Sequence, residues 1–454
     1  MREYLFEKAL LPEGWADNVL VAVGAGGAIA RVEPGAQSGT AERLSGIALP
    51  GMPNLHCHAF QKGMAGLAER RGPANDSFWT WREVMYRFLG ALTPDDVEAI
   101  AACAYMEMLE AGFTAVGEFH YLHHDVGGAP YADLGEMSAR IASASAEAGI
   151  GLTLLPCLYT YGGFKAAPSN EGQARFINDT DRFLALWSRA QEIVKSLPDA
   201  AIGIAPHSLR AVTPEQLSAI ADAGLTGPVH IHAAEQTREV DESVAALGAR
   251  PVQWLLDNAD LDRRWCLIHA THMTTDETRR LAQSGAVAGL CPLTEGSLGD
   301  GFFNGDTYLA ADGHFGIGTD SNIQIDAPGE LRQLEYSQRL KLRARNVMAT
   351  REGQSTGLSL YRNALKGGAQ ALGRRIGTIA EGARADIVVL DRSHPDLAGA
   401  ERDTVLDVFI FSAGRAMIGQ TMVGGKVVVT GGRHHARDKI AQRYRNVVAR
   451  LSRS

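Results

Sequence analysis

Short apolar runs separated by glycine-rich turns open the chain. The runs at residues 4–6 and 19–23 precede a turn at residues 24–27, and this pattern predicts a small antiparallel β element. From about residue 50 the pattern changes, because apolar runs of strand length now alternate with amphipathic stretches of helix length. This part of the chain is therefore expected to consist of parallel βα units.

Eight strand candidates follow one another in this part. They cover residues 47–55, 115–121, 151–157, 201–207, 229–232, 265–269, 286–291 and 315–320. A helical pattern over residues 94–111 lies between the first two candidates. Because parallel strands need long crossover connections, eight strands with helices between them predict an α/β fold of the TIM barrel class, (β/α)8.

The chain after the eighth candidate contains helical patterns at 328–347 and 357–373, then apolar strands at 386–390 and 422–429. These late strands are expected to pair with residues 1–48, since the two ends of a chain often meet in one domain. The predicted organisation is a composite β-sandwich domain from the two chain ends, a barrel and a basic C-terminal helix packed on the surface. The boundaries are 1–48, 49–376, 377–435 and 436–454.

Histidines and a carboxylate stand at the ends of several predicted strands. His56 and His58 are two residues apart at the first, so both side chains can reach the same point. His232 ends the fifth strand and Asp320 ends the eighth. Because barrel active sites lie at the carboxyl ends of the strands, these four residues are predicted to bind one Zn²⁺ ion per subunit, or another divalent ion such as Fe²⁺.

Two further residues are predicted to act in catalysis beside Asp320. Glu235 follows His232 by three residues and could carry a proton from a metal-bound water to a leaving amine. His269, at the end of the sixth strand, could hydrogen-bond that water, and Asp320 could also accept a proton from it. His230 shares a face with His232 and is an alternative ligand. The other candidates are His120, His123, His124, His207 and His272.

Composition narrows the class of protein. The 454 residues are 45% hydrophobic and carry a net charge of -8, which argues against a nucleic-acid partner. Five cysteines without a CxxC motif suggest neither a disulfide framework nor a cysteine zinc site. The first residues do not resemble a signal peptide, and no apolar run reaches the ~18 residues of a membrane span. We therefore expect a cytoplasmic protein without a membrane partner.

Several motifs together resemble the amidohydrolase superfamily. They lie at residues 50–58, 232–235, 269, 319–321 and 377–391. This resemblance implies a metal-bearing barrel with a β-sandwich built from both chain ends. Members with two metals often bridge them with a carboxylated lysine at strand four, where this chain has Pro206, His207 and Ser208. The resemblance therefore implies the mononuclear, deaminase-like branch.

A closer resemblance connects the chain to the formimidoylglutamate deiminase family, through residues 60–68, 76–86, 118–124 and 207–212. It implies zinc-dependent hydrolysis of N-formimidoyl-L-glutamate to N-formyl-L-glutamate and ammonia, a step of histidine degradation. It also implies a homodimer. The residues that it assigns to substrate binding are Gln61, Arg82, Tyr121, His207 and Arg210.

Two of these residues agree with an acidic substrate on physical grounds. Arg82 and Arg210 can each offer a bidentate fork to one carboxylate of a dianion. Arg82 lies in an aromatic stretch, residues 78–86, which we expect to be a loop folded over a pocket, and residues 291–297 and 321–324 are expected to shape the pocket wall. Alternative functions are a deaminase of the same superfamily that acts on a purine, pterin or triazine, and a non-catalytic scaffold barrel.

Overall fold

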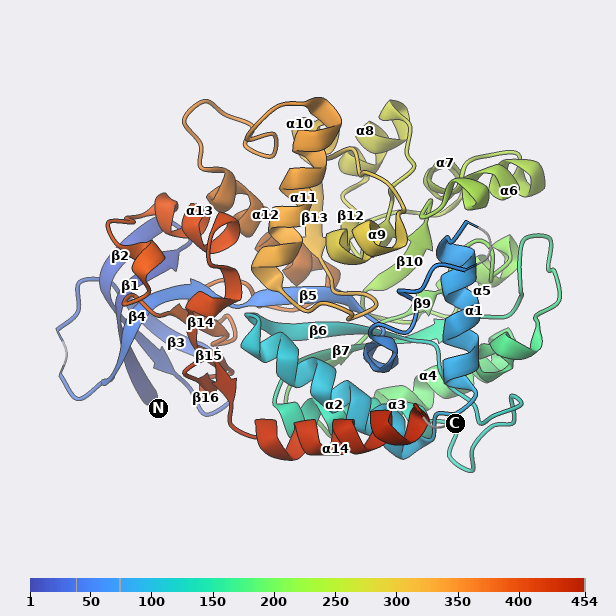
Figure 1. Cartoon of the computed structure of the whole chain (residues 1–454), viewed down its shortest axis with the longest axis horizontal. Coiled ribbons are helices and arrows are strands. Elements are labelled where there is room, and N and C mark those ends of the chain that lie inside the picture. The colour runs from blue at the N-terminus through green and yellow to red at the C-terminus, as the bar shows by residue number, and fades with distance from the viewer. Residues whose placement is uncertain (38, 73–74, 453–454) are drawn as a thin grey trace.

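The structure is a computed structural model that describes residues 1–37, 39–72 and 75–452. A parallel barrel forms most of the molecule, and a second sheet made from both ends of the chain lies on one side of it (Figure 1). The expected architecture, a TIM barrel with a β domain from the two chain ends, is confirmed.

The barrel strands follow the predicted candidates in order. They are β5 (Met52–Cys57), β6 (Phe113–His120), β7 (Gly151–Leu158), β8 (Ala200–Ile202), β9 (Ala205–Pro206), β10 (Val229–Ala233), β11 (Trp265–His269), β12 (Val287–Leu290) and β13 (His314–Ile317). All neighbours in the order β10-β11-β12-β13-β5-β6-β7-β8 are parallel, and β9 pairs with β7. Isolated parallel bridges from Ile204 to Val229 and from Ser208 to His232 close the ring. The fourth predicted strand is thus interrupted between β8 and β9.

The first predicted strand, 47–55, is wrong as a single element. Residues up to Pro50 belong to β4 (Glu42–Pro50) of the end sheet, and the barrel strand β5 begins at Met52. Gly51 lies between them and donates its N–H to the carbonyl of Asp386 in the late segment. A Cβ on Gly51 would lie 2.3 Å from the side chain of Thr114, so only glycine fits where the chain passes from one sheet to the other.

The second sheet has eight strands in the order β17-β16-β15-β14-β4-β1-β2-β3. Its other strands are β1 (Arg2–Leu11), β2 (Gly14–Val23), β3 (Ile29–Glu33), β14 (Ile387–Leu390), β15 (Ile418–Val423), β16 (Lys426–Thr430) and β17 (Arg433–His434). The predicted antiparallel pairing holds for β1, β2 and β3, but β1 also pairs with β4 in parallel. The antiparallel pairing of β4 with β14 joins the two ends of the chain.

Helices cover the outside of the barrel. They are α1 (Phe78–Leu89), α2 (Pro94–Glu110), α3 (Glu136–Ala148), α4 (Thr180–Lys195), α5 (Pro214–Asp222), α6 (Thr237–Leu247), α7 (Pro251–Asn258), α8 (Thr275–Ser284), α9 (Pro292–Leu298), α10 (Gly305–Ala310), α11 (Ala327–Leu342) and α12 (Thr356–Ala371), with 3-10 turns at Ala59–Met64 and Glu171–Phe176. The predicted helix 328–347 ends earlier, because Arg343 adopts a left-handed conformation with φ 54°.

Two of these elements matter for the site. The aromatic stretch around Arg82, expected as a loop, is the helix α1, which begins with a capping box between Ser77 and Thr80. The end of α12 closes the bottom of the barrel, where Ala371 and Leu372 pack with Leu55 and Ile268. The open end of the barrel is therefore the end at which the strands finish.

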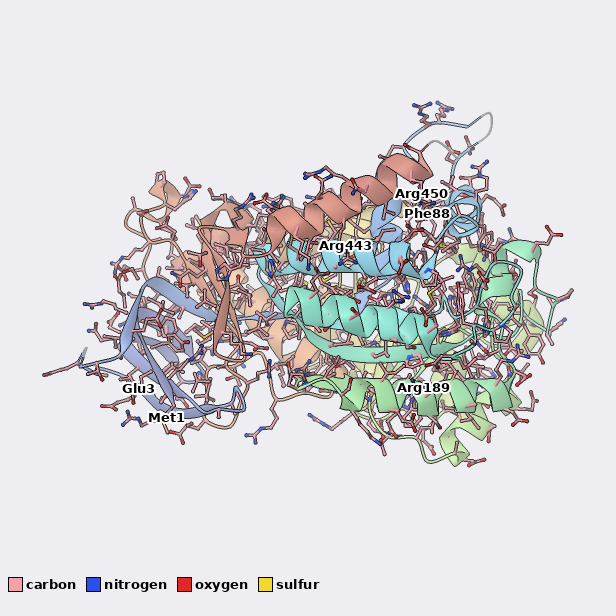
Figure 2. The ribbon with its side chains drawn as sticks, turned by 90° about the horizontal axis from the view of Figure 1, so that it is seen from below. Met1, Glu3, Phe88, Arg189, Arg443 and Arg450 are labelled. Carbon is pink, nitrogen blue, oxygen red and sulfur yellow. The ribbon has the colours of Figure 1, made fainter. Side chains whose placement is uncertain are left out.

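The C-terminal segment adds α13 (Asp403–Phe411), 3-10 turns at Pro395–Leu397 and Gly414–Met417, and α14 (Arg437–Leu451). Figure 2 shows α14 lying along the barrel helices, with Arg443 and Arg450 on it. Arg443 pairs with Glu98 at 3.3 Å and with Glu147 at 2.5 Å, and Arg450 pairs with Asp96. Residues 453–454 of the predicted terminal helix lie outside the described residues. None of the described helices is long and apolar enough to cross a membrane.

Candidate active site

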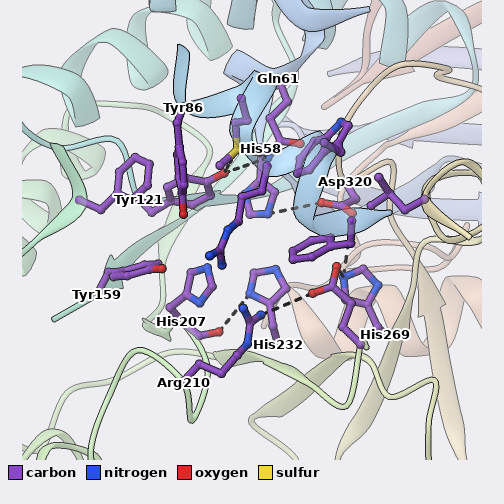
Figure 3. Close-up of a pocket in the computed structure, with 17 residues that line it drawn as sticks. His58, Gln61, Tyr86, Tyr121, Tyr159, His207, Arg210, His232, His269 and Asp320 are labelled. Carbon is purple, nitrogen blue, oxygen red and sulfur yellow. Dashed lines mark hydrogen bonds and ion pairs between the residues drawn. The ribbon is translucent and has the colours of Figure 1, made fainter. Parts of the chain in front are cut away.

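A pocket opens at the carboxyl ends of the barrel strands, and most of the predicted site residues line it. Among its lining residues are His58, Gln61, Arg82, Tyr121, His207, Arg210, His232, Glu235, His269 and Asp320. Figure 3 shows His58, His232, His269 and Asp320 directed toward a common centre, with Tyr159, His207 and Arg210 on the side away from Asp320. The structure therefore brings the predicted metal, catalytic and substrate residues into one cavity.

The four predicted metal ligands form a tight group. The Nε2 atoms of His56 and His232 are 3.2 Å apart. Oδ1 of Asp320 lies 3.4 Å from Nε2 of both His56 and His58. A tetrahedral ion with bonds of about 2.1 Å separates its ligand atoms by about 3.4 Å. These three separations match the spacing of a tetrahedral site, and the donor atoms of His56, His58 and His232 all lie within 4.8 Å of one another.

The three imidazoles are held in the form that binds a metal. Burial lowers the pKa of His56 to about 3 and lowers the pKa values of His58 and His232, so the rings are neutral at physiological pH. The Nδ1 atoms of His58 and His232 lie 2.8 Å and 3.0 Å from the carbonyls of Phe119 and His207. These carbonyls accept the Nδ1 protons and leave Nε2 free to coordinate.

Asp320 is fixed by a network of side-chain amides. Its backbone is left-handed, with φ 44°, so it lies outside the regular geometry of β13. Asn322 donates to the carbonyls of Asp320 and His58 at 2.9 Å and 3.0 Å, and it accepts from Thr319, whose hydroxyl also accepts from Asn54. Asn322 therefore ties two of the predicted ligands together. Burial alone would raise the pKa of Asp320, but the nearby histidines offset it and keep the carboxylate ionised.

The alternative histidines lie elsewhere. His230 directs Nε2 to the carbonyl of Ala371 at 2.7 Å, one layer below His232 and toward the closed bottom of the barrel. His123 and His124 contact the carbonyls of Cys157 and Ile177. His120, His123, His124 and His272 are absent from the pocket lining, whereas His207 is part of it. Of the five alternatives beyond His230, only His207 reaches the site.

A second possible ligand group contains His269, Cys291 and Asp320. Burial raises the pKa of the Cys291 thiol well above its ordinary value, which keeps the sulfur protonated at neutral pH. Because the thiolate is the form that binds metal, this group is the weaker candidate. All five cysteines are free and buried.

Glu235 and His269 stand next to the metal ligands. Oε1 of Glu235 is 3.7 Å from Nε2 of His269, which in turn lies 4.0 Å from Oδ2 of Asp320. Burial raises the pKa of Glu235 to about 7. A carboxyl group with this pKa can both take up and release a proton at neutral pH, which is what a proton carrier in hydrolysis must do.

The opposite side of the pocket carries positive charge. Arg210 is 3.6 Å from Glu235, and its Nε has no hydrogen-bond partner within the described part of the chain. Arg82 stacks on Trp79 and Tyr86, forms no ion pair with any described carboxylate, and also has an unpartnered, buried Nε. Arginines with free donors in a pocket are suited to binding a carboxylate ligand.

The pocket also contains aromatic residues that the sequence analysis did not name individually, although Tyr86 lies in the stretch 78–86 that was expected to fold over it. Tyr86, Tyr159 and Phe176 line it, and the hydroxyl of Tyr159 accepts a hydrogen bond from Gln173 at 2.7 Å. Tyr86 lies one helical turn after Arg82 on α1, so helical spacing could have identified it. Phe176 comes from a 3-10 turn in a long connection, and no pattern in the sequence pointed to it.

Comparison with known proteins connects this geometry to a family. The model of the Amidohydrolase family matches residues 47–428. The model described as Formimidoylglutamate deiminase HutF, N-terminal domain, matches residues 6–46. A formimidoylglutamate deiminase of Pseudomonas aeruginosa is 50% identical over 446 residues, which are 98% of each chain. The chain belongs to the formimidoylglutamate deiminase branch of the amidohydrolase family. As the sequence suggested, this amidohydrolase is an enzyme of the hydrolase class.

Solved structures agree with this assignment. An amidohydrolase from Brucella melitensis superimposes with a TM-score of 0.96 at 52% identity, covering 100% of both chains. An adenosine deaminase from Xanthomonas campestris with bound zinc has a TM-score of 0.82 at 22% identity, covering 100% of this chain and 98% of that one. The second likeness shows that amidohydrolases with a different named activity share this fold.

The geometry of the ligand group leads to a test of metal binding. Asp320→Asn removes a charged ligand, and we expect metal content measured by inductively coupled plasma mass spectrometry to fall well below one ion per chain. His230→Gln can still donate to the carbonyl of Ala371 and should retain the ion. Loss of metal in His230→Gln with retention in Asp320→Asn would reverse the choice of ligands.

Proposed function

We propose that this amidohydrolase hydrolyses N-formimidoyl-L-glutamate to N-formyl-L-glutamate and ammonia, the deimination step of histidine degradation. The observation that carries the proposal is the pairing, in one pocket, of a metal-ligand group with two arginines that have free donors. The 50% identity to a formimidoylglutamate deiminase over nearly the whole chain supports the same substrate.

The charges of the pocket complement those of this substrate. N-formimidoyl-L-glutamate carries one carboxylate on the carbon that bears the formimidoylamino group and a second carboxylate at the end of its side chain. Arg82 and Arg210 would bind the carboxylates, with Gln61, Tyr121 and His207 supplying further polar contacts from the pocket wall. Gln61 already donates to the hydroxyl of Tyr121 at 2.8 Å, and its oxygen has no partner among the described residues. That oxygen is free to accept a hydrogen bond from an N–H of the substrate.

The metal site would lie at the reacting end. We assign His56, His58, His232 and Asp320 as ligands of one Zn²⁺ ion per subunit, since their donor spacing fits tetrahedral coordination. When bound, the ion supplies Lewis-acid chemistry that makes water a stronger nucleophile near neutral pH. Zinc is the ion bound in the structurally similar adenosine deaminase, whereas the ligand set alone would also accept Fe²⁺.

The protein groups beside that site would move the protons. Glu235 would take one proton from the attacking water and deliver it to the imino nitrogen as the C–O bond forms. It would then transfer the remaining hydroxyl proton to the same nitrogen, so that the carbonyl forms, the C–N bond breaks and ammonia leaves. Asp320 would assist in removing the proton from water. His269, 3.7 Å from Glu235, would hydrogen-bond the oxygen on which negative charge develops. All three groups are buried, so bulk water does not compete with these transfers.

The oligomeric state, the compartment and the domain boundaries are further proposals. We propose a cytoplasmic homodimer, because two-fold dimers are the commonest oligomers and histidine degradation is a metabolic function. We also propose the division 1–48, 49–376, 377–435 and 436–454, which follows the change from the end sheet to the barrel and back.

The proposed reaction is tested by ammonia release from the purified, zinc-loaded protein. Rapid release is expected with N-formimidoyl-L-glutamate, and little with guanine or an s-triazine, because flat neutral rings offer nothing for two arginines to bind. The rate with the aspartate homologue shows how strictly the pocket selects for the distance between the two carboxylates. Absence of release from the glutamate compound, with one zinc ion bound per chain, would exclude the proposed substrate.

Glu235→Gln is expected to lower kcat by about 10³-fold, because an amide cannot carry a proton between water and nitrogen. The amide has the same shape and Glu235 is not a metal ligand, so zinc content should be unchanged. Rates near those of the unsubstituted enzyme would show that another group transfers the proton.

Arg82→Ala is expected to raise KM for N-formimidoyl-L-glutamate by about 10- to 100-fold, which corresponds to the loss of one or two charge-assisted hydrogen bonds. Arg87→Ala is the matched control, since Arg87 is exposed on the same helix and does not line the pocket. An equal KM in the two variants, measured by steady-state ammonia release, would mean that Arg82 does not bind the substrate.

A further inference from the structure

A buried carboxylate that the proposed reaction does not use lies directly behind His269. Glu295 is on α9, after β12, and only 6% of its surface is exposed. Its Oε1 is 3.3 Å from Nδ1 of His269. Because β11 and β12 are adjacent parallel strands, the start of α9 stands beside the end of β11, where His269 is. Within the described part of the chain, Glu295 is the one hydrogen-bond partner of this nitrogen.

Glu295 is itself held firmly in place. The same Oε1 accepts the backbone N–H of Cys291 at 2.9 Å. The start of α9 is anchored from two other directions, because Glu330 accepts the N–H of Leu293 at 2.8 Å and the hydroxyl of Thr294 donates to the carbonyl of Thr319 at 3.2 Å. The carboxylate of Glu295 therefore has a fixed position next to the ring of His269.

The backbone conformation of His269 does not by itself determine the orientation of the imidazole ring, so a fixed hydrogen-bond partner is needed. The residue has φ 69°, and the following Ala270 has φ 47°, so both have left the extended conformation of β11. The alternation of side chains along a strand consequently no longer determines the direction of this ring. A hydrogen bond at Nδ1 fixes both the rotation of the ring and the position of its proton.

We propose that Glu295 is the positioning residue of His269: it accepts the Nδ1 proton and so directs Nε2 toward Glu235 and Asp320, where the reaction takes place. The proposal rests on the function proposed above, since it assumes that His269 acts in the reaction. Glu295 itself does not line the pocket and would not touch the substrate.

The test compares three single variants in the zinc-loaded enzyme. Glu295→Leu removes the acceptor, and kcat is expected to fall about 10- to 100-fold, the effect typical of losing a partner that orients a catalytic imidazole. KM, zinc content and melting temperature should stay near those of Glu335→Gln, which alters a buried carboxylate of α11 whose hydrogen bonds go to Arg339, Val347 and Met348 and not to His269 or α9. Glu295→Gln retains an oxygen acceptor and should recover most of kcat.

A double-mutant cycle then separates positioning from general damage. If Glu295 acts through His269, adding Glu295→Leu to His269→Asn should lower kcat no further than His269→Asn alone. An equal fold-loss in both backgrounds would overturn the proposal, and so would an unchanged kcat in Glu295→Leu. If Glu295→Leu does not fold, Glu295→Ala removes the same acceptor and the same outcomes decide.

Failure of the proposed function would look different. No ammonia release by the unsubstituted enzyme would reject the substrate, and an unchanged kcat in His269→Asn would reject the catalytic role of His269. Both results differ from additive effects on kcat in the double-mutant cycle. Additive effects can be observed only if the unsubstituted enzyme is active and each single variant has a lower kcat.

Discussion

The buried clustering of the predicted metal ligands, with their donor atoms unprotonated, is the constraint on which the rest of the structure depends. Nε2 of His56 lies 3.2 Å from Nε2 of His232 at the mouth of the barrel, and the carboxylate of Asp320 lies 3.4 Å from both His56 and His58. Burying a carboxylate without a compensating charge is unfavourable in free energy. The surrounding residues must therefore hold Asp320 in its buried position. The interrupted strands, the left-handed residues at the strand ends and the Asn54–Thr319–Asn322 network all serve this purpose. Left-handed non-glycine residues cost roughly 1–3 kcal/mol each, which the surrounding packing offsets.

Acidic and basic groups lie on different sides of the pocket. Acidic groups and the predicted metal ligands occupy one wall, formed by the ends of β5, β10, β11 and β13, and Arg82 with the aromatic residues occupies the other. Arg210 is the link between the two, at 3.6 Å from Glu235. A substrate with separate anionic and electrophilic groups would therefore have one favourable orientation. The same separation would allow a chain with a net charge of -8 to bind the proposed dianion, because the local field and not the total charge decides binding.

Much of this arrangement was predictable from the sequence. The alternation of apolar runs and amphipathic stretches predicted the barrel. The histidines were predicted to form a site because each of them lies at the end of a predicted strand. The predictions that were wrong failed because of local features of the chain. Apolar residues continue through Gly51, so periodicity could not show that the chain changes sheets there. The aromatic residues near Arg82 suggested a loop, although Ser77 and Thr80 form a helix cap that hydropathy does not register. Phe176 reaches the site through a 3-10 turn in a long connection. Glu295 lies in the segment that was expected to shape the pocket wall, but its contact with His269 depends on tertiary packing that a single sequence does not contain.

The pairing of β4 with β14 has a consequence for the order in which the protein can be made. β4 continues through Gly51 directly into β5, which contains His56 and leads into His58. In the end sheet β4 pairs with β1 on one side and with β14 on the other. The ribosome synthesises β4 more than 300 residues before β14. During elongation, this strand has an open edge, and the first strand of the barrel is attached to an incomplete sheet. The end sheet that supports the predicted site is therefore completed only after β14 has been synthesised, and a chain terminated before β14 would contain the predicted ligand histidines without that support.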